Sequence, residues 1–207
     1  VYVQYKDNAG NWSNSISDTI ILDTTGSDTI PPTGTISINN GAEYTNSTSV
    51  TLTLSASDSG SGVNKMKFSN NGVSWSTEED YATSASWTLG TGDGLKIVFV
   101  QYKDNAGNWS GPTSISDTII LDTMAPSGTI LINNGAQYTN STSVTLTLLA
   151  IDGGSGVSKV KFSNEGVSWS SEDDYATSKS WTLTTGDGTK TVYVQYKDNA
   201  GNWNSPT

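Results

Sequence analysis

The chain has 207 residues and a net charge of −10, with ten Lys and 20 Asp or Glu but no Arg, His or Cys. This composition excludes a thiolate nucleophile, an imidazole base and metal sites built from nitrogen and sulfur ligands. The negative charge excludes nucleic acid and anionic membrane surfaces as partners, because they carry the same sign, so we expect any charged partner to be a cation.

Strand-like alternation runs through the whole chain, and no segment has a helical period or the apolar length for membrane insertion. The first twelve residues, VYVQYKDNAGNW, recur with one substitution at 98–109 and unchanged at 192–203. Residues 28–109 align without a gap onto residues 122–203, and only 18 of these 82 positions differ. The chain is therefore an array of near-identical modules.

Within the copy that spans 28–122, turn residues interrupt the alternation about every 8 to 12 residues, as in an all-β sandwich. Residues 49–57 show the pattern well, with Val50, Leu52 and Leu54 facing inward between Thr and Ser residues. Asn70-Asn-Gly72 is a signal for a tight hairpin. Seven strands are predicted, at 35–39, 49–57, 63–70, 73–76, 84–89, 96–103 and 114–121.

Pro-containing segments at 23–32 and 122–126 mark the expected module boundaries. Residues 1–23 then form the last two strands of a preceding module, residues 24–123 a complete module and residues 124–207 a module that lacks its last strand. We call these the first, middle and last modules. Modules cut at both ends suggest a window on a longer array.

Several motifs carry a resemblance to a known family. They are the segments Asp58–Val63, Trp87–Leu89, Val98–Asn108 and Asp122–Pro126. This pattern resembles the bacterial and archaeal immunoglobulin-like (fibronectin-III-like) tandem repeats of large cell-surface and extracellular proteins. The resemblance implies tandem seven-stranded β-sandwiches in an elongated array, located outside the cell or on its surface. It implies no single function, because such sandwiches serve as stalks, adhesins and enzyme appendages.

Oxygen-bearing side chains gather at each expected module junction. In a seven-stranded sandwich the second and sixth strands both end where the first strand begins, so three distant segments meet there. Ca²⁺ takes 6 to 8 oxygen ligands in a flexible geometry. We therefore predict an interdomain Ca²⁺ site at each junction, and the resemblance supports one, since related repeats are stiffened in this way. The predicted ligands are Asp28, Asp58, Asp104, Asn105 and Asn108, and in the next copy Asp122, Asp152, Asp198, Asn199 and Asn202.

Simple turn chemistry is the alternative for these loops, because Asp, Asn and Gly also form bare turns. The first linker has five more residues than the second, including Asp23, which could add a ligand or loosen the hinge. We expect the second junction, with its shorter linker, to be the more rigid.

Two other residue classes suggest binding. The Trp residues could stack on sugars, with Trp109 the best candidate for an exposed ring, although their recurrence at fixed positions in each copy favours packing. The acidic cluster Glu78–Asp80, and its copy Glu172–Asp174, could hold a second cation or contact another chain, although a solvated loop on an acidic protein is the favoured explanation. No acidic pair lies in one copy alone, so we expect no enzyme.

The leading hypothesis is a structural repeat of a long extracellular or cell-surface protein, such as a stalk, adhesin shaft or filament, stiffened by Ca²⁺. Its expected partners are neighbouring modules of the same chain and other copies in a filament. The alternative is a glycan-binding or protein-binding Ig-like module of a secreted protein. In the last module, the missing final strand would leave the strand at 192–197 as an exposed edge.

Overall fold

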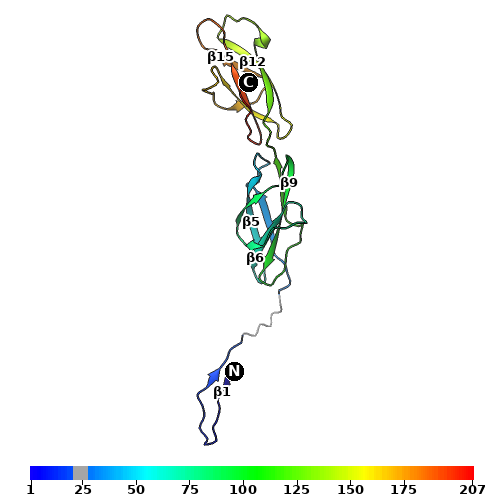
Figure 1. Ribbon diagram of the computed structural model, residues 1–207, viewed down its shortest axis with the longest axis vertical. Helices are drawn as coiled ribbons and strands as arrows, with labels where there is room; N and C mark the ends of the chain where they lie inside the picture. Colours follow the sequence, from blue (N-terminus) through cyan, green and yellow to red (C-terminus); the bar gives the residue numbers. More distant parts are fainter. Residues whose placement is uncertain (21–27) are drawn as a thin grey trace.

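A computed structural model describes residues 1–20 and 28–207. The described residues are all-β apart from one short 3₁₀ helix, η1 (Asn133–Gly135). A hairpin of β1 (Tyr2–Val3) and β2 (Ile16–Ser17) comes first, and two β-sandwiches follow it along the chain (Figure 1). The expected all-β class with tandem Ig-like sandwiches is confirmed. No helix among the described residues has the length and apolar character needed to span a bilayer.

The middle module is a sandwich of a three-stranded antiparallel sheet and a five-stranded mixed sheet. One sheet has the order β3 (Thr33–Ile38), β5 (Ser49–Ser57), β8 (Ser84–Thr88). The other has the order β4 (Tyr44–Thr45), β10 (Ser116–Leu121), β9 (Gly94–Asp104), β6 (Val63–Ser69), β7 (Glu79–Asp80), in which only the β4–β10 pair is parallel.

The last module repeats this plan with fewer strands. Its sheets have the orders β11 (Ser127–Ile132), β12 (Ser143–Ile151), β15 (Ser178–Thr182) and β14 (Asp173–Asp174), β13 (Val157–Ser163), β16 (Tyr193–Asp198). Strand β16 has 6 residues where β9 has 11, because no counterpart of β10 lies beside it.

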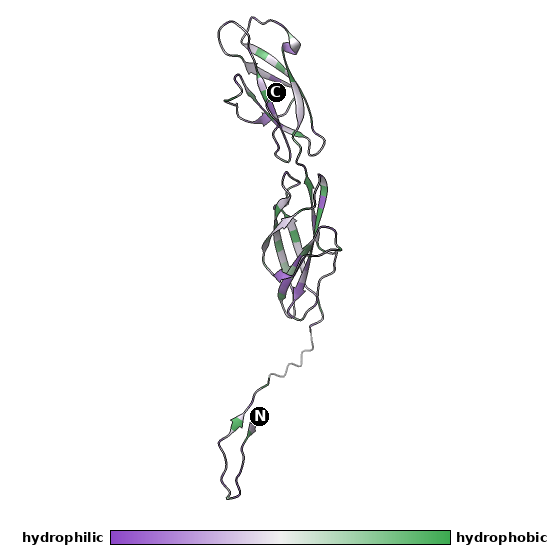
Figure 2. Ribbon diagram, in the orientation of Figure 1, coloured by the Kyte–Doolittle hydropathy of each residue, from purple (hydrophilic) through white to green (hydrophobic). Residues whose placement is uncertain are grey.

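The alternation of apolar and polar residues places the core between the sheets. Apolar positions are concentrated on the strands in Figure 2, and in β5 the residues Val50, Leu52 and Leu54 are buried while the Thr residues between them are exposed. Burial of each such side chain stabilises the folded state by about 1.5 to 3 kcal/mol. The alternation in the sequence therefore predicted correctly which face of the strand is inside.

Tyr102 is the largest of the fully buried side chains of this core. Its hydroxyl donates a hydrogen bond to the Thr35 carbonyl at 2.8 Å, and its ring meets that of Tyr81 edge-on at 5.8 Å between centroids. Gly34 lies beside it, where a Cβ atom would stand 2.7 Å from the Tyr102 ring and 2.4 Å from the Ser55 carbonyl oxygen. The last module repeats this arrangement with Tyr196.

One predicted strand is wrong. Residues 73–74 form a bend, in which the Asn71 side-chain oxygen accepts hydrogen bonds from the amides of Val73 and Ser74, and residues 75–76 belong to no strand. The sequence also did not reveal two short strands of the middle module, β4 and β7, which form the two edges of its five-stranded sheet. The boundary predicted at residue 23 lies outside the described residues, and the domain limits stay a prediction.

Candidate cation site at the module junctions

Three carboxylates from distant segments meet at the start of the middle module. Asp28 precedes β3, Asp58 follows β5 directly, and Asp104 ends β9. Each offers a carboxylate oxygen, and these three oxygens lie within 4.8 Å of one another. We call this set the first triad. Sandwich topology creates it, since these strand ends share one edge of the fold.

The turn after β5 orients the Asp58 carboxylate. The Asp58 Oδ2 atom accepts hydrogen bonds from the backbone amides of Gly60 at 3.1 Å and Gly62 at 2.7 Å. Gly62 has φ +82°, the left-handed region that favours glycine. The DSGSG segment is therefore a turn whose own amides orient the carboxylate.

Asp28 enters the same turn from the linker. Its carboxylate accepts hydrogen bonds from the amides of Ile30 at 3.0 Å and Ser61 at 2.9 Å, and these bonds hold its pKa below the usual value. A Cβ atom on Gly60 would lie only 2.4 Å from this carboxylate. Gly60 is thus required for the approach of Asp28, which sequence reasoning missed although the Gly recurs in both copies.

Asp104 is the buried member of the first triad, with 1 % of its surface exposed. Burial acts to raise its pKa, but hydrogen bonds from the side chain and backbone of Asn108 and from the Gly107 amide outweigh this and lower it. The Asn108 amide donates to Oδ1 at 2.8 Å and its Nδ2 donates to Oδ2 at 2.7 Å. Asp104 is therefore kept ionised beside two other carboxylates.

One oxygen of the first triad has no hydrogen-bond partner. Among the described residues, Asp58 Oδ1 is the buried side-chain polar atom that no donor satisfies. A buried carboxylate oxygen without a donor is costly, and its neighbours here are like charges. The other oxygens already accept protein donors, but each keeps a further acceptor site. This combination suits a cation better than a bare turn.

The last module repeats the arrangement at its own start. Oxygens of Asp122, Asp152 and Asp198 lie within 4.8 Å of one another, and we call this set the second triad. Asp122 and Asp198 are both 1 % exposed. The hydrogen bonds match those of the first triad, with the Ser155 amide donating to Asp122 Oδ2 at 2.7 Å.

The predicted amide ligands lie at the triads with their nitrogens turned inward. Asn105 Nδ2 donates to the carbonyls of Ser61 and Gly62 and so ties the two loops together. Asn108 Nδ2 donates to the Asp28 carbonyl as well as to Asp104. Asn199 and Asn202 repeat these bonds in the last module. These nitrogens organise the carboxylates, and only the amide oxygens could serve as ligands.

The middle module contributes directly to the second junction. The Asp93 side chain, in the turn before β9, accepts hydrogen bonds from the Thr123 amide at 3.2 Å and its hydroxyl at 2.9 Å. A hollow of about 420 Å³ is lined by Asp93, Asp122, Asp152 and Ile151 among others. Sequence reasoning missed Asp93, although the turn that carries it lies at the end of the sandwich that faces the next module.

The middle module also lies close to the loop that carries Asp198. The Asn46 side-chain nitrogen lies 3.7 Å from where a Cβ atom on Gly201 would stand. Gly201 belongs to the loop that carries Asp198, so the second triad sits against the preceding module. At the first junction the equivalent contacts would involve the linker at 21–27. These residues, with the additional Asp23 among them, lie outside the described part of the chain.

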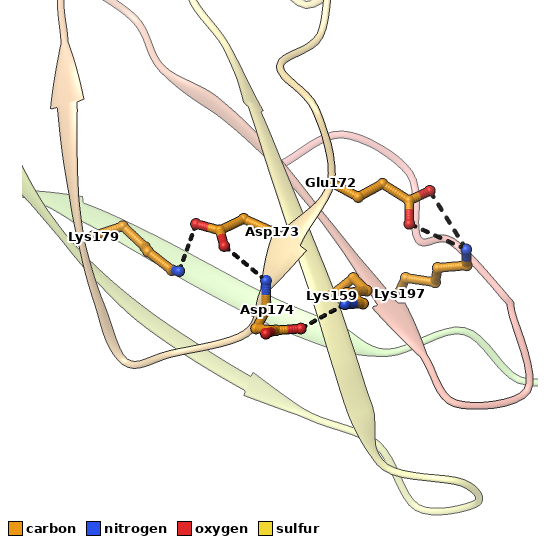
Figure 3. A network of polar contacts seen from close by, with 6 residues as sticks. All are labelled: Lys159, Glu172, Asp173, Asp174, Lys179 and Lys197. Atoms are coloured by element: carbon orange, nitrogen blue, oxygen red, sulfur yellow. Dashed lines mark hydrogen bonds and ion pairs between the residues drawn. The ribbon is translucent and has the colours of Figure 1, made fainter.

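The acidic cluster of each module is paired with lysine. In the last module Lys159 contacts Asp174 at 2.5 Å, Lys179 contacts Asp173 at 2.6 Å and Lys197 contacts Glu172 at 3.4 Å (Figure 3). In the middle module Lys65 and Lys103 pair likewise with Asp80 and Glu78. Such exposed pairs add little stability. In the last module they neutralise all three carboxylates and do not favour a second cation there, whereas in the middle module Ala85 takes the place of Lys179 and the ion pairs involve two of the three carboxylates.

Lysine side chains lie over two of the three Trp rings in each sandwich, whereas Trp87 and Trp181 pack against Phe68 and Phe162. Trp109 is half-buried, and Lys67 Nζ lies 4.1 Å from its ring centroid, with Lys103 Nζ at 5.3 Å. The last module repeats this stack with Trp203 and Lys161 at 4.2 Å. The expectation of a freely exposed ring at Trp109 is wrong, because cation–π contacts occupy its face.

Comparisons with known proteins agree with this architecture. The family model for the bacterial Ig domain matches residues 31–115 and 126–194. Fibronectin(III)-like modules of Clostridium thermocellum CbhA are similar in structure, with a TM-score of 0.50 and 17 % identity over 83 % of this chain and 90 % of that one. A cytokine receptor complex aligns over 83 % of this chain and 93 % of that one, but its TM-score of 0.28 at 10 % identity carries no argument. No curated protein matches the chain.

Proposed function

The chain belongs to the bacterial Ig domain family, and on that premise we propose that it is a structural segment of a long extracellular or cell-surface protein, stiffened by Ca²⁺ at its module junctions. Domains of this family are typically extracellular and non-catalytic. Ca²⁺ would bind at the first and second triads. The proposed role is that of a stalk, adhesin shaft or filament.

The observation that carries the proposal is the unpartnered Asp58 Oδ1 atom inside a cluster of three carboxylates. Bare turns explain the backbone hydrogen bonds of each Asp, but they do not explain why three like charges converge. A divalent cation would neutralise most of this charge and supply the missing partner. All available donors are hard oxygens, as Ca²⁺ prefers.

The mechanical consequence follows from which segments supply the ligands. In the second triad Asp122 belongs to the linker, whereas Asp152 and Asp198 belong to loops of the last module. An ion bound to all three would fix the linker to the last module, while the Asp93–Thr123 contacts fix it to the middle module. The ion would thereby set the angle between neighbouring sandwiches.

Chromatography-coupled small-angle X-ray scattering of the monomeric chain tests this role. We expect Ca²⁺ to lengthen the maximum dimension relative to chelator, because bent arrangements of the modules are depleted. The double variant Asp58→Asn with Asp152→Asn should give the same scattering in both conditions.

The matched control changes two paired surface carboxylates, Asp80→Asn with Asp174→Asn, and alters the net charge equally. It should keep the Ca²⁺ response. Superimposable curves with and without Ca²⁺ for the unmodified chain would contradict the stiffening role.

A further inference from the structure

Five exposed aliphatic residues distinguish the two sandwiches from each other. The modules differ at 18 of 82 aligned positions, and at five of these one module has Leu or Ile where the other has Ser or Thr. We call these five aliphatic residues the junction set. They are Leu95 and Ile97 in the middle module and Leu131, Leu149 and Ile151 in the last module. Their exposed fractions range from 37 to 68 %, so they face solvent rather than the core of their own module.

In the last module the junction set lies on the outer face of the sheet formed by β11, β12 and β15. Leu148 of β12 is buried, so Leu149 points away from the core, as does Ile151. Leu131 of β11 lies opposite Thr147 and diagonal to Leu149 on the same face. In the middle module the outward positions of β5 are all Ser or Thr, so the fold itself does not require aliphatic residues there.

In the middle module the junction set lies on the outer face of the five-stranded sheet. Leu95 and Ile97 point away from the core, because Val98 and Val100 of the same strand are buried. Leu95 lies opposite Ile120 of β10, which is half-buried and adds to the apolar surface. Both residues of the junction set stand at the start of β9, directly after the turn that contacts the linker.

The two parts of the junction set approach each other at the second junction. The hollow of about 420 Å³ is lined there by Asp93 of the middle module and by Met124 and Ile151. The Cα atom of Leu95 is two residues from Asp93 and therefore at most about 7 Å from its Cα atom. Apolar positions are visible on strands at both sides of this junction (Figure 2). The equivalent positions at the other end of each sandwich are Ser and Thr, so these exchanges are concentrated at one junction.

The surface around the junction set is flat and uncharged. The outward positions of β10, β11 and β12 carry Ser, Thr, Leu and Ile. Contiguous exposed apolar residues mark contact surfaces, and covering these strands removes no charge from water. Such a surface suits the outer face of another β-sheet, because two sheets pack face to face through apolar and small polar side chains.

The two modules of one chain do not cover the junction set. The Asp93 side chain holds the linker to the middle module through Thr123, and the Ser155 amide holds it to the last module through Asp122. Folding the chain at the linker to close one part of the junction set over the other would break these hydrogen bonds. The cover must therefore come from another molecule.

The area of the surface indicates what kind of molecule this is. A stable contact buries about 800 Å² on each partner. An aliphatic side chain supplies less than the roughly 150 Å² of a small aromatic one, so the part of the junction set on one module is not enough. The partner must lie along both modules and present a long, uncharged apolar face. A second copy of this chain has both properties.

We propose that two copies of this chain pack side by side through the junction set, related by a two-fold axis. A two-fold contact uses the same surface on both copies, as this one does. It holds the second junction from outside and is independent of Ca²⁺, since no residue of the junction set belongs to a triad. Repulsion between two chains of net charge −10 opposes it, and salt screens this repulsion.

Sedimentation equilibrium of the full chain in chelator tests the proposal over a range of concentrations and at low and high salt. We expect the mass to rise from the 21.8 kDa of one chain towards twice that value, at lower concentrations in high salt. Two double variants, Leu149→Ser with Ile151→Ser and Leu95→Thr with Ile97→Thr, carry the residues that the other module has at these positions. Both should fold, and each should raise the dissociation constant of the dimer by about 100-fold or more, because every substitution counts twice in a two-fold contact.

The matched control removes two exposed aliphatic side chains outside the junction set, Val73→Ser with Val167→Ser. These residues are 81 % and 80 % exposed, and the variant should associate as the unmodified chain does. An unmodified chain that stays monomeric at all concentrations would overturn the proposal. So would a variant of either part of the junction set that associates as tightly as the control, or a mass that rises beyond that of a dimer.

Discussion

Ca²⁺ at about 10 mM is expected to raise the free energy of unfolding of the middle module by about 2.7 kcal/mol. The figure follows from a dissociation constant of about 10⁻⁴ M, which is typical of extracellular modules, and an ion that binds the folded state alone. The physical source is the first triad, whose ligands come together only when the sandwich is folded. Thermal unfolding followed by calorimetry in Ca²⁺ and in chelator measures it.

Asp58→Asn should abolish the stabilisation by Ca²⁺. In chelator the variant is expected to be more stable than the unmodified chain, because it removes one of three like charges and its amide can donate to a neighbouring carboxylate. In Ca²⁺ it should gain almost nothing. Asp80→Asn is the control, since Asp80 is an exposed carboxylate paired with Lys65. Equal stabilisation of the two variants by Ca²⁺ would contradict the site.

Tyr102→Ala should destabilise the middle module by about 3 to 5 kcal/mol, because it leaves a cavity where the largest fully buried side chain of the core stood. The midpoint of that module's unfolding should fall by more than about 10 °C. Modules of an array unfold as largely local units, so the transition of the last module should stay in place. Differential scanning calorimetry resolves the two transitions.

Two further variants test whether each unfolding transition belongs to one module. Tyr196→Ala should lower the other transition, since Tyr196 has the same place in the last module. Tyr102→Phe should cost only about 1 kcal/mol, because it keeps the ring and loses the hydrogen bond to Thr35. A single transition that moves equally with Tyr102→Ala and Tyr196→Ala would show that the modules unfold together.

The sequence revealed most of the sandwich because its signals are periodic and repeated. Alternation identified the buried face of β5, and the repeat fixed which segments correspond. The same reasoning placed Asp28, Asp58 and Asp104 at one end of the fold, and their carboxylates do converge there. The direction of each strand decides which loops lie at the same end of the sandwich, and the periodicity of the sequence is enough to derive these directions.

The remaining features depend on tertiary contacts that no local pattern encodes. The strand predicted at 73–76 is absent, and the equivalent residues 167–170 of the last module also form no strand, although Glu165 stands there in place of Asn71. Strand β4 exists only where β10 lies beside it, so the same residue types form no strand in the last module. The cation–π contact of Lys67 with Trp109 joins β6 to the segment after β9, and alternation alone gives no partner for either side chain.

A crystal structure of the chain grown in Ca²⁺, with the ion identified by its anomalous scattering, tests the central claim most directly. We expect one ion at each triad, with carboxylate oxygens of Asp28, Asp58 and Asp104 at about 2.3 to 2.6 Å from the first ion. The second ion should contact the second triad in the same way. Triads that remain without an ion at saturating Ca²⁺ would contradict the account.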